Sequence, residues 1–176
     1  IGVTGVTWNC RIMPIRSFFA DGQKSDTTEA DYAEAFRWAA AHGADIFNNS
    51  WGWSANPPVI MHSAIVDITK AGGIGRGGKG CVVLHSMGND PGPWTFYPQS
   101  FPEVIAVGAT DHSDQRTWYS SYGPDLDVMA PSGGGVAAAE NIRSGYRRTM
   151  PFQLRTDMTP AGAQPAAIRQ LTEGLA

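Results

Sequence analysis

Four short apolar runs along the chain are each typical of a buried β-strand. They lie at residues 11–17, 46–50, 81–86 and 104–109. The run that begins Cys-Val-Val-Leu at Cys81 is almost unbroken by polar side chains, and so is the run that begins at Val104. Continuous apolar runs of this kind indicate strands that are buried on both faces, as in a parallel sheet.

Two segments between these runs place apolar residues at helical spacing. The first begins with Thr28-Glu-Ala-Asp31, which predicts a capping box, and it ends at Gly43. Its inward positions are predicted to be Tyr32, Ala35, Phe36 and Ala39. The second helix is predicted from about residue 57 to about residue 71. Its inward positions are predicted to be Ile60, Ala64, Ile65 and Ile68.

Helices that alternate with buried strands predict an α/β fold in three layers, with helices on both faces of a mostly parallel sheet. Ligands of such sheets bind outside the carboxyl ends of the strands. The first candidates for a functional site are therefore residues 50–52, residues 87–90 and the stretch after Ala109.

Composition narrows the classes of function. Of the 176 residues, 42% are hydrophobic and 16% are charged, which is typical of a globular domain with a sizeable core. The net charge of -3 gives no attraction for nucleic acid or for an anionic membrane. No apolar run approaches the ~20 residues of a membrane span, and no signal peptide stands at Ile1.

Two other features favour structural interpretations. Cys10 and Cys81 permit a disulfide without implying one, and Cys81 opens an apolar run, as a small core side chain would. The glycine-rich stretch at residues 73–80 matches G-x-G-x-x-G and most of a phosphate-binding loop. Both phosphate motifs need a strand before the glycines and a helix after them, whereas here a predicted helix precedes and a strand follows. A connecting loop is the better interpretation.

The strand at residues 81–86 leads into Gly88-Asn89 at its carboxyl end. A side-chain amide held there is a neutral hydrogen-bond donor that can face a developing oxyanion. Taken alone, Gly-Asn is more typical of an ordinary turn. The neighbouring segments decide between the two interpretations.

Four segments, in the same order, resemble segments of the subtilisin-like serine proteases (subtilases). Residues 35–52 resemble the helix and strand that end in N-x-S-x-G, and residues 78–90 resemble the oxyanion-hole strand. Residues 97–111 and 118–134 resemble the next two family segments. The resemblance covers about residues 1–135 and implies an incomplete peptidase domain, followed by a divergent segment from residue 136 to residue 176.

The resemblance implies roles at the carboxyl edge of the sheet. It assigns Asn89 to the oxyanion hole. It implies that one backbone segment pairs with an extended substrate, a recurring mode of peptide capture, and that a second forms a wall of the pocket for the residue before the scissile bond. The segment that pairs with the substrate is Ser50, Trp51 and Gly52. The segment that forms the pocket wall is Ser86, Met87 and Gly88. Trp51 is bulky for its position and equally fits a packing role. The bond between Tyr97 and Pro98 is implied to be cis.

The resemblance leaves all three residues of the catalytic triad unmatched. In the family, the Asp and a His in H-G-T lie upstream of a segment like Ile-Gly-Val-Thr-Gly-Val, and the nucleophilic Ser stands in G-T-S-x-A-x-P. None of the histidines has the H-G-T context; they are His42, His62, His85 and His112. Because the triad acts as a unit, the chain as given is predicted to be inactive.

The end of the chain has two interpretations, since residues 160–176 contain no Ser. One aligns Pro165 with the Pro of the motif and Ala161 with the nucleophile. The other is a reading-frame slip after Thr159, because the last codons, read in another frame, permit Tyr-Gly-Gly-Thr-Ser. A helix predicted at residues 165–175 has a narrow apolar stripe and is expected to be peripheral.

The resemblance therefore implies a fragment of a secreted endopeptidase, extracellular or in the cell envelope, that acts on peptides or proteins in extended conformation. The alternative is a non-catalytic pseudoprotease that binds peptides. The chemistry requires no cofactor, and no metal site is predicted within the chain. Calcium is common in the family, and residues 1–3 resemble the end of a calcium loop whose other ligands are missing.

Overall fold

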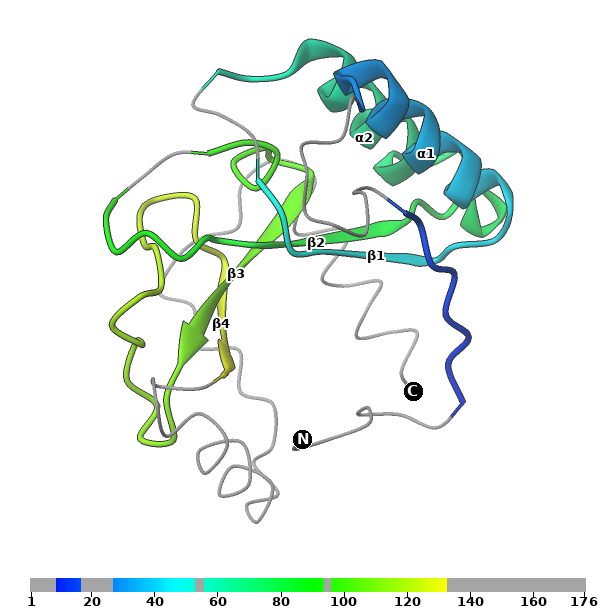
Figure 1. The fold of residues 1–176 in the computed structure, drawn as a ribbon. Coiled ribbons are helices and arrows are strands. Elements are labelled where there is room, and N and C mark those ends of the chain that lie inside the picture. Colours follow the sequence, from blue (N-terminus) through cyan, green and yellow to red (C-terminus); the bar gives the residue numbers. More distant parts are fainter. Residues whose placement is uncertain (1–8, 17–26, 53–55, 94–95, 133–176) are drawn as a thin grey trace.

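The computed structural model describes residues 9–16, 27–52, 56–93 and 96–132. Within these ranges the chain forms two α-helices, one 3-10 turn and four strands. In chain order they are α1 (Glu29–Ala41), β1 (Ile46–Asn49), α2 (Val59–Thr69), η1 (Arg76–Gly78), β2 (Val82–Ser86), β3 (Val104–Thr110) and β4 (Val128–Pro131). The strands form one parallel sheet in the order β1-β2-β3-β4 (Figure 1). This is the α/β fold predicted from the sequence.

Helix α1 begins at the predicted capping box. The Thr28 hydroxyl accepts a hydrogen bond from the Asp31 amide at 3.3 Å, and the Asp31 carboxylate accepts one from the Thr28 amide at 2.8 Å. The helix ends before Gly43, whose φ of +95° is a conformation that glycine adopts without strain. Three of the predicted inward residues are buried, while Ala35 is half-buried; the buried ones are Tyr32, Phe36 and Ala39.

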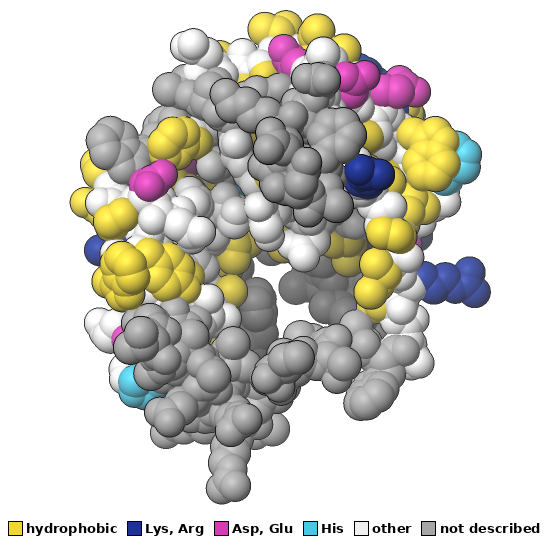
Figure 2. Space-filling model, viewed as in Figure 1, with side chains coloured by type: hydrophobic (Ala, Val, Ile, Leu, Met, Phe, Trp, Pro, Cys, Tyr) yellow, Lys and Arg dark blue, Asp and Glu magenta, His cyan; other side chains and the backbone are white. Residues whose placement is uncertain are grey.

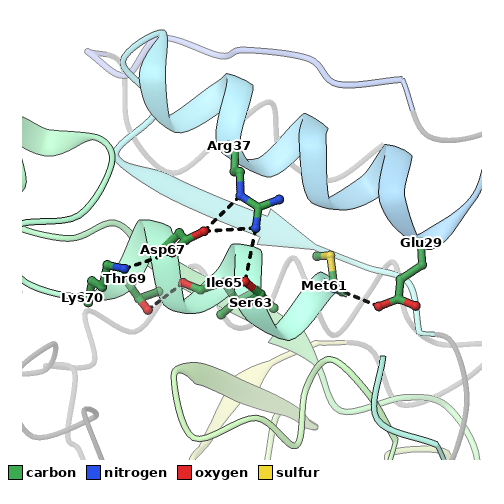
Figure 3. Close-up of polar contacts among 8 residues, drawn as sticks. All are labelled: Glu29, Arg37, Met61, Ser63, Ile65, Asp67, Thr69 and Lys70. Carbon is green, nitrogen blue, oxygen red and sulfur yellow. Dashed lines mark hydrogen bonds and ion pairs between the residues drawn. The ribbon is translucent and has the colours of Figure 1, made fainter. Parts of the chain in front are cut away.

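A side chain of α1 caps the N-terminus of helix α2. Its own N-cap residue, Pro58, offers no side-chain hydrogen bond. The Glu29 carboxylate accepts instead from the amide of Ile60 and from the amide of Met61, and Figure 3 draws the second of these contacts. A carboxylate at this end also interacts favourably with the helix dipole. Further along the two helices, the Arg37 guanidinium donates to the Asp67 carboxylate at 3.0 and 3.1 Å.

The inward face of α2 corrects one prediction. Ile60, expected to face inward, is 48% exposed, and Met61 is fully buried in its place. The buried positions are Met61, Ala64, Ile65 and Ile68, which follow the i, i+3, i+4, i+7 spacing of one stripe. Ile60 lies about 100° around the helix from Met61, outside that stripe.

Both described α-helices lie on the same face of the sheet (Figure 1), so the described residues form two of the three predicted layers. In the register of the sheet, Phe47 pairs with Val83, and Val83 pairs with Val104. These three side chains are buried in one core cluster with the inner faces of the helices. The core of the described residues therefore lies between the sheet and the α1–α2 layer.

The strand predicted at residues 11–17 is not in the sheet. Residues 11–16 form no strand, Ile12 is 89% exposed and Ile15 is 42% exposed, while residue 17 lies outside the described ranges. A groove of about 1180 Å³ lies between residues 9–15 and the elements α1 and β1. Backbone N–H and C=O groups form a strand only when a neighbouring strand takes up their hydrogen bonds, and the segment runs apart from β1. Figure 2 shows apolar side chains along it.

Strand β4 is one that the sequence pattern did not predict. It is four residues long and ends in Pro131, so it lacks the long apolar run by which the other strands were found. Its position at the edge of the sheet, paired with β3, is one of the few that accept proline.

The glycine-rich stretch between α2 and β2 has the predicted order of helix, glycines and strand. At Gly80, φ is +82° and a Cβ would lie 2.1 Å from the Thr69 carbonyl oxygen, so packing alone requires glycine there. Both thiols are free, and Cys81 is buried as predicted, with its thiol donating to the Ala44 carbonyl. Burial raises the pKa of Cys81 to about 11, which keeps the thiol protonated and unreactive.

Candidate active-site edge of the sheet

The parallel register brings the predicted site segments to one edge of the sheet. Asn49, the last residue of β1, pairs with His85, the penultimate residue of β2. Residues 50–52 and 86–88 therefore leave the sheet side by side at its carboxyl edge, and Asn89 follows directly. The edge of an α/β sheet at which ligands bind is this one.

Asn89 stands on a turn that Ser121 holds from both sides. The Ser121 amide donates to the Gly88 carbonyl at 3.1 Å, and the Ser121 hydroxyl donates to the Asp90 carbonyl at 2.6 Å. The same hydroxyl oxygen accepts from the Asp90 amide at 3.2 Å. Gly88 has a φ of +110°, and a Cβ there would lie 3.0 Å from the Ser121 oxygen. The turn is thus fixed through its backbone, and the Asn89 side chain is left exposed.

Trp51 has the packing role that its size suggested. Its half-buried ring lies 4.9 Å from the Tyr32 ring and 4.9 Å from the His85 imidazole, measured between centroids. Its flanking residues, Ser50 and Gly52, are exposed. The ring therefore anchors the segment to the core, while the backbone on both sides of it faces solvent.

His85 is buried under this segment in a neutral state. It is 1% exposed, its Nδ1 lies 3.3 Å from the Ser86 carbonyl oxygen, and its Nε2 has no hydrogen-bond partner. Burial lowers the pKa of His85 to about 4, because the charged imidazolium loses its solvation there. A buried neutral imidazole of this kind is a packing group and not an accessible base.

Two of the other histidines are engaged in local contacts. His42 caps α1 and stacks on Trp38 with ring centroids 4.0 Å apart. His62 stacks on Phe101 at 4.1 Å, and its Nε2 lies 3.0 Å from the Glu103 carboxylate. His112 is exposed in the turn after β3. Of the four histidines, His85 is buried near the end of β2, His62 is half-buried within α2, and His42 and His112 are exposed.

The structure adds Gln99 to the site, a residue that the sequence did not single out. The Tyr97–Pro98 bond before it is cis, as the resemblance implied. The Gln99 side chain is 3% exposed, and its amide nitrogen lies 3.4 Å from the point where a Cβ on Gly52 would stand. The only signal in the sequence was its place next to Tyr97-Pro98. Ser121 was likewise within a recognised segment, but nothing in the pattern linked it to Asn89.

The described residues can be searched for two further features, a metal site and a membrane-spanning helix. Across the described ranges, no three His, Cys, Asp or Glu side chains come together in a way that could hold a metal ion. No helix within those ranges is long and apolar enough to cross a membrane.

Comparison with solved structures finds the same fold in other proteins. The chain superposes on the prenylagaramide maturation protease PagA with a TM-score of 0.53 and 24% identity, over 64% of this chain and 40% of that one. It superposes on the protease domain of PatA with a TM-score of 0.53 and 22% identity, over 70% of this chain and 50% of that one. At these identities the likeness establishes the α/β fold.

Sequence comparison establishes the family. The model of the subtilase family matches residues 1–160. The chain is 32% identical to a thermophilic serine proteinase of Bacillus sp. (strain AK1) over 145 residues, which are 82% of the chain and 33% of that protein. It is 30% identical to subtilisin BL of Lederbergia lenta over 146 residues, 83% of the chain and 47% of that protein. A calcium-dependent protease of Trichormus variabilis is 33% identical over 147 residues, 76% of the chain and 21% of that protein.

The chain belongs to the subtilase family. It spans less than half the length of each of these curated relatives. The family match also continues past residue 135, where the resemblance was expected to fade, and ends at residue 160. The residues beyond 132 lie outside the described ranges, among them Ala161 and the helix predicted at residues 165–175.

Proposed function

We propose that the whole protein hydrolyses peptide bonds as a serine endopeptidase, and that this chain supplies its substrate-binding edge and one oxyanion donor. The observation that carries the proposal is the turn at Asn89, which Ser121 holds at the carboxyl edge beside residues 50–52. Membership of the subtilase family supports the reaction class.

The geometry supports a simple division of roles. An extended peptide would pair with the exposed backbone of residues 50–52, and residues 86–88 would line the pocket for the residue before the scissile bond. The Asn89 amide would donate to the oxygen that becomes negatively charged. In subtilisin itself, one such donor is worth about 3–4 kcal/mol of transition-state stabilisation.

We further propose that the 176-residue chain cannot cut peptides by itself. Its histidines match no H-G-T motif, His85 is buried and neutral, and the Cys81 thiol is held protonated. An oxyanion donor without nucleophile and base gives weak residual catalysis at most. Residues 136–176 are proposed to be a divergent C-terminal segment, of which residues 136–160 still fall within the family match.

Fluorophosphonate labelling tests the proposal. The purified chain should give no labelled serine and no hydrolysis of peptide esters above background. A longer product of the same gene that contains the family's Asp and H-G-T upstream and G-T-S downstream should be labelled at that Ser. Labelling of a defined Ser in the 176-residue chain would contradict the assignment of the missing triad.

A pseudoprotease is the second candidate, because the edge formed by Ser50, Gly52 and Asn89 is exposed whether or not a triad is present. The nucleotide sequence separates the two. Since the family match ends at residue 160, a frame slip after Thr159 predicts that the other frame runs open through G-T-S into an apolar helix. Stop codons in that frame, together with no H-G-T upstream, would favour the pseudoprotease.

The environment of the protein is proposed from its relatives. Subtilisins among them support an extracellular or cell-envelope location, which cell fractionation of the source organism would test. The name of the calcium-dependent relative supports calcium binding by the whole protein.

A further inference from the structure

The imidazole of His85 lies buried against the Trp51 ring. In the register of the sheet (Figure 1), His85 stands between Asn49 of β1 and Ala106 of β3, which are both buried in hydrogen-bonded strands. Trp51 is different, because it follows the end of β1 and is half-buried. Its ring meets the imidazole nearly edge-on, at an interplanar angle of 80°. Of these neighbours, Trp51 is therefore the one that can move without breaking the sheet.

The position of the proton on His85 follows from its contact with Ser86. Nδ1 lies 3.3 Å from the Ser86 carbonyl oxygen, which can only accept, so Nδ1 carries the hydrogen and Nε2 is a bare acceptor. Nε2 has no hydrogen-bond partner among the described residues. A second proton would bind at Nε2 and create a charged donor where no acceptor stands, and a buried charge without a partner is costly.

No charged neighbour offsets this cost. Burial lowers the pKa of His85 to about 4, its backbone hydrogen bond opposes the shift, and no charged side chain of the described ranges contributes. The neighbouring strands present Asn49 and Ala106 to the imidazole, and α1 presents the Tyr32 phenol on the Trp51 ring. An imidazolium at this place becomes stable only when water reaches it, which requires Trp51 to move.

We propose that His85 is a pH-sensitive switch for the edge segment, residues 50–52. While the imidazole is neutral, Trp51 packs on it and holds the segment to the core. When Nε2 binds a proton, Trp51 leaves the core and the segment is released, while the core between the sheet and the two helices stays folded. Peptide capture at this edge would then weaken in acid; that consequence rests on the proposed function, whereas the switch itself does not.

Cleavage of the full 176-residue chain after Trp51 by added chymotrypsin measures the opening, because the ring must leave the core to enter the protease. Each rate is divided by that of a free peptide with the sequence of residues 46–56 at the same pH, which removes the pH dependence of chymotrypsin. When reclosing is fast, this ratio gives the open population. With a pKa of about 4 in the closed state and 6.5 in the open state, the ratio should rise roughly 25-fold from about pH 7.5 to about pH 5.

Two variants give the matched comparison. His85→Phe keeps a ring in the buried position and should remove the rise, whereas His112→Gln, at the exposed histidine after β3, should keep it. If His85→Phe does not fold, the profile of the unaltered chain gives the readout. Titration of His85 predicts a rise that begins near pH 6.5, whereas carboxylates of ordinary pKa would produce one only below about pH 5.

Cleavage after Phe36, a buried residue of α1, is the internal reference for unfolding of the core. Normalised with its own free peptide, it should stay slower than cleavage after Trp51 at each pH. Equal normalised rates would show that acid unfolds the whole core, and the switch would be wrong.

Two other results would overturn the switch. A flat profile after Trp51 would show that the imidazolium is tolerated in place, as a cation–π contact with the ring allows. A rise that persists in His85→Phe would assign the opening to other groups. Neither result bears on the fluorophosphonate test of the triad, so the proposed function is tested separately.

Discussion

The two faces of the sheet differ in how well the described residues cover them. On the face under α1 and α2, Phe47, Val83 and Val104 are between 0% and 8% exposed. On the opposite face, Val82 and Ile105 are also buried, but Ile46 is 56% exposed and Leu84 is half-buried. Both faces carry apolar residues from the same strands, so hydrophobicity along the sequence does not distinguish them.

The difference shows where the stability of the described residues is generated. Burial of a large apolar side chain contributes about 1.5–3 kcal/mol, and only side chains that are removed from water contribute it. The helix-covered face also has polar ties between its layers, from Arg37 to Asp67 and from Glu29 to the amides of α2. The exposed part of the opposite face at Ile46, and the edge at β1, where the described residues add no further strand, are therefore the regions where an isolated chain is expected to aggregate.

The largest expected effect compares one substitution on the two faces. Ile65→Ala removes a fully buried side chain beneath α2 and should lower the free energy of unfolding by about 2–5 kcal/mol. Ile46→Ala, at the exposed position of β1, should cost less than about 1 kcal/mol. Urea unfolding followed by circular dichroism measures both. Equal losses would show that the two faces are equally well buried.

A second prediction concerns the protonation of His85, whose side chain is buried on the helix-covered face of the sheet. The pKa of His85 is about 4 in the folded chain and 6.5 for an unperturbed imidazole. Because its folded pKa is the lower one, the unfolded chain binds more protons between these values, and stability falls as pH drops from 6.5 towards 4. The loss is at most roughly 3 kcal/mol.

Urea midpoints measured across that pH range test this behaviour. His85→Phe keeps an aromatic ring in the buried position and should flatten the pH dependence. His112→Gln, at the exposed histidine after β3, should leave it intact. A His85→Phe variant that keeps the full slope would assign the titration to other groups.

The smallest predicted effect on stability concerns the carboxyl edge that joins the two faces. Ser121→Ala removes the hydroxyl that bonds both backbone groups of Asp90 and should cost about 1–2 kcal/mol. The larger consequence is local: the side-chain amide signals of Asn89 should broaden as the turn loosens. Ser113→Ala, at an exposed position, is the control. Unchanged Asn89 signals in Ser121→Ala would show that Ser121 does not fix the turn that bears Asn89.

Most of the sheet could be predicted because its strands are apolar runs of ordinary length. The capping box at Thr28 and Asp31 and the buried residues of α1 follow equally local rules. The run at residues 11–17 met the same criterion, yet residues 11–16 form no strand. An apolar run indicates that a segment is suited to burial, but pairing depends on a neighbour that the run itself does not specify.

The candidate site was predictable only in part, for a related reason. Ser50–Gly52 and Gly88-Asn89 follow strands directly, so the topology of a parallel sheet brings them together. Gln99 and Ser121 reach the same edge from loops far along the chain, through contacts that depend on the final packing. Hydrophobic periodicity predicts neither the burial of Gln99 nor the hydrogen bonds that Ser121 makes.

The hydrogen bonds between Asp90 and Ser121 also bear on the order in which the chain is synthesised and folds. The two residues are 31 positions apart, so the segment with Asn89 leaves the ribosome well before the residue that fixes it. Until then, β2 ends in an untied turn. A nascent or proteolytically shortened chain that stops before residue 121 would carry Asn89 without the hydrogen bonds that fix its turn. The proposed oxyanion donor would therefore reach its final geometry later than the strand that precedes it.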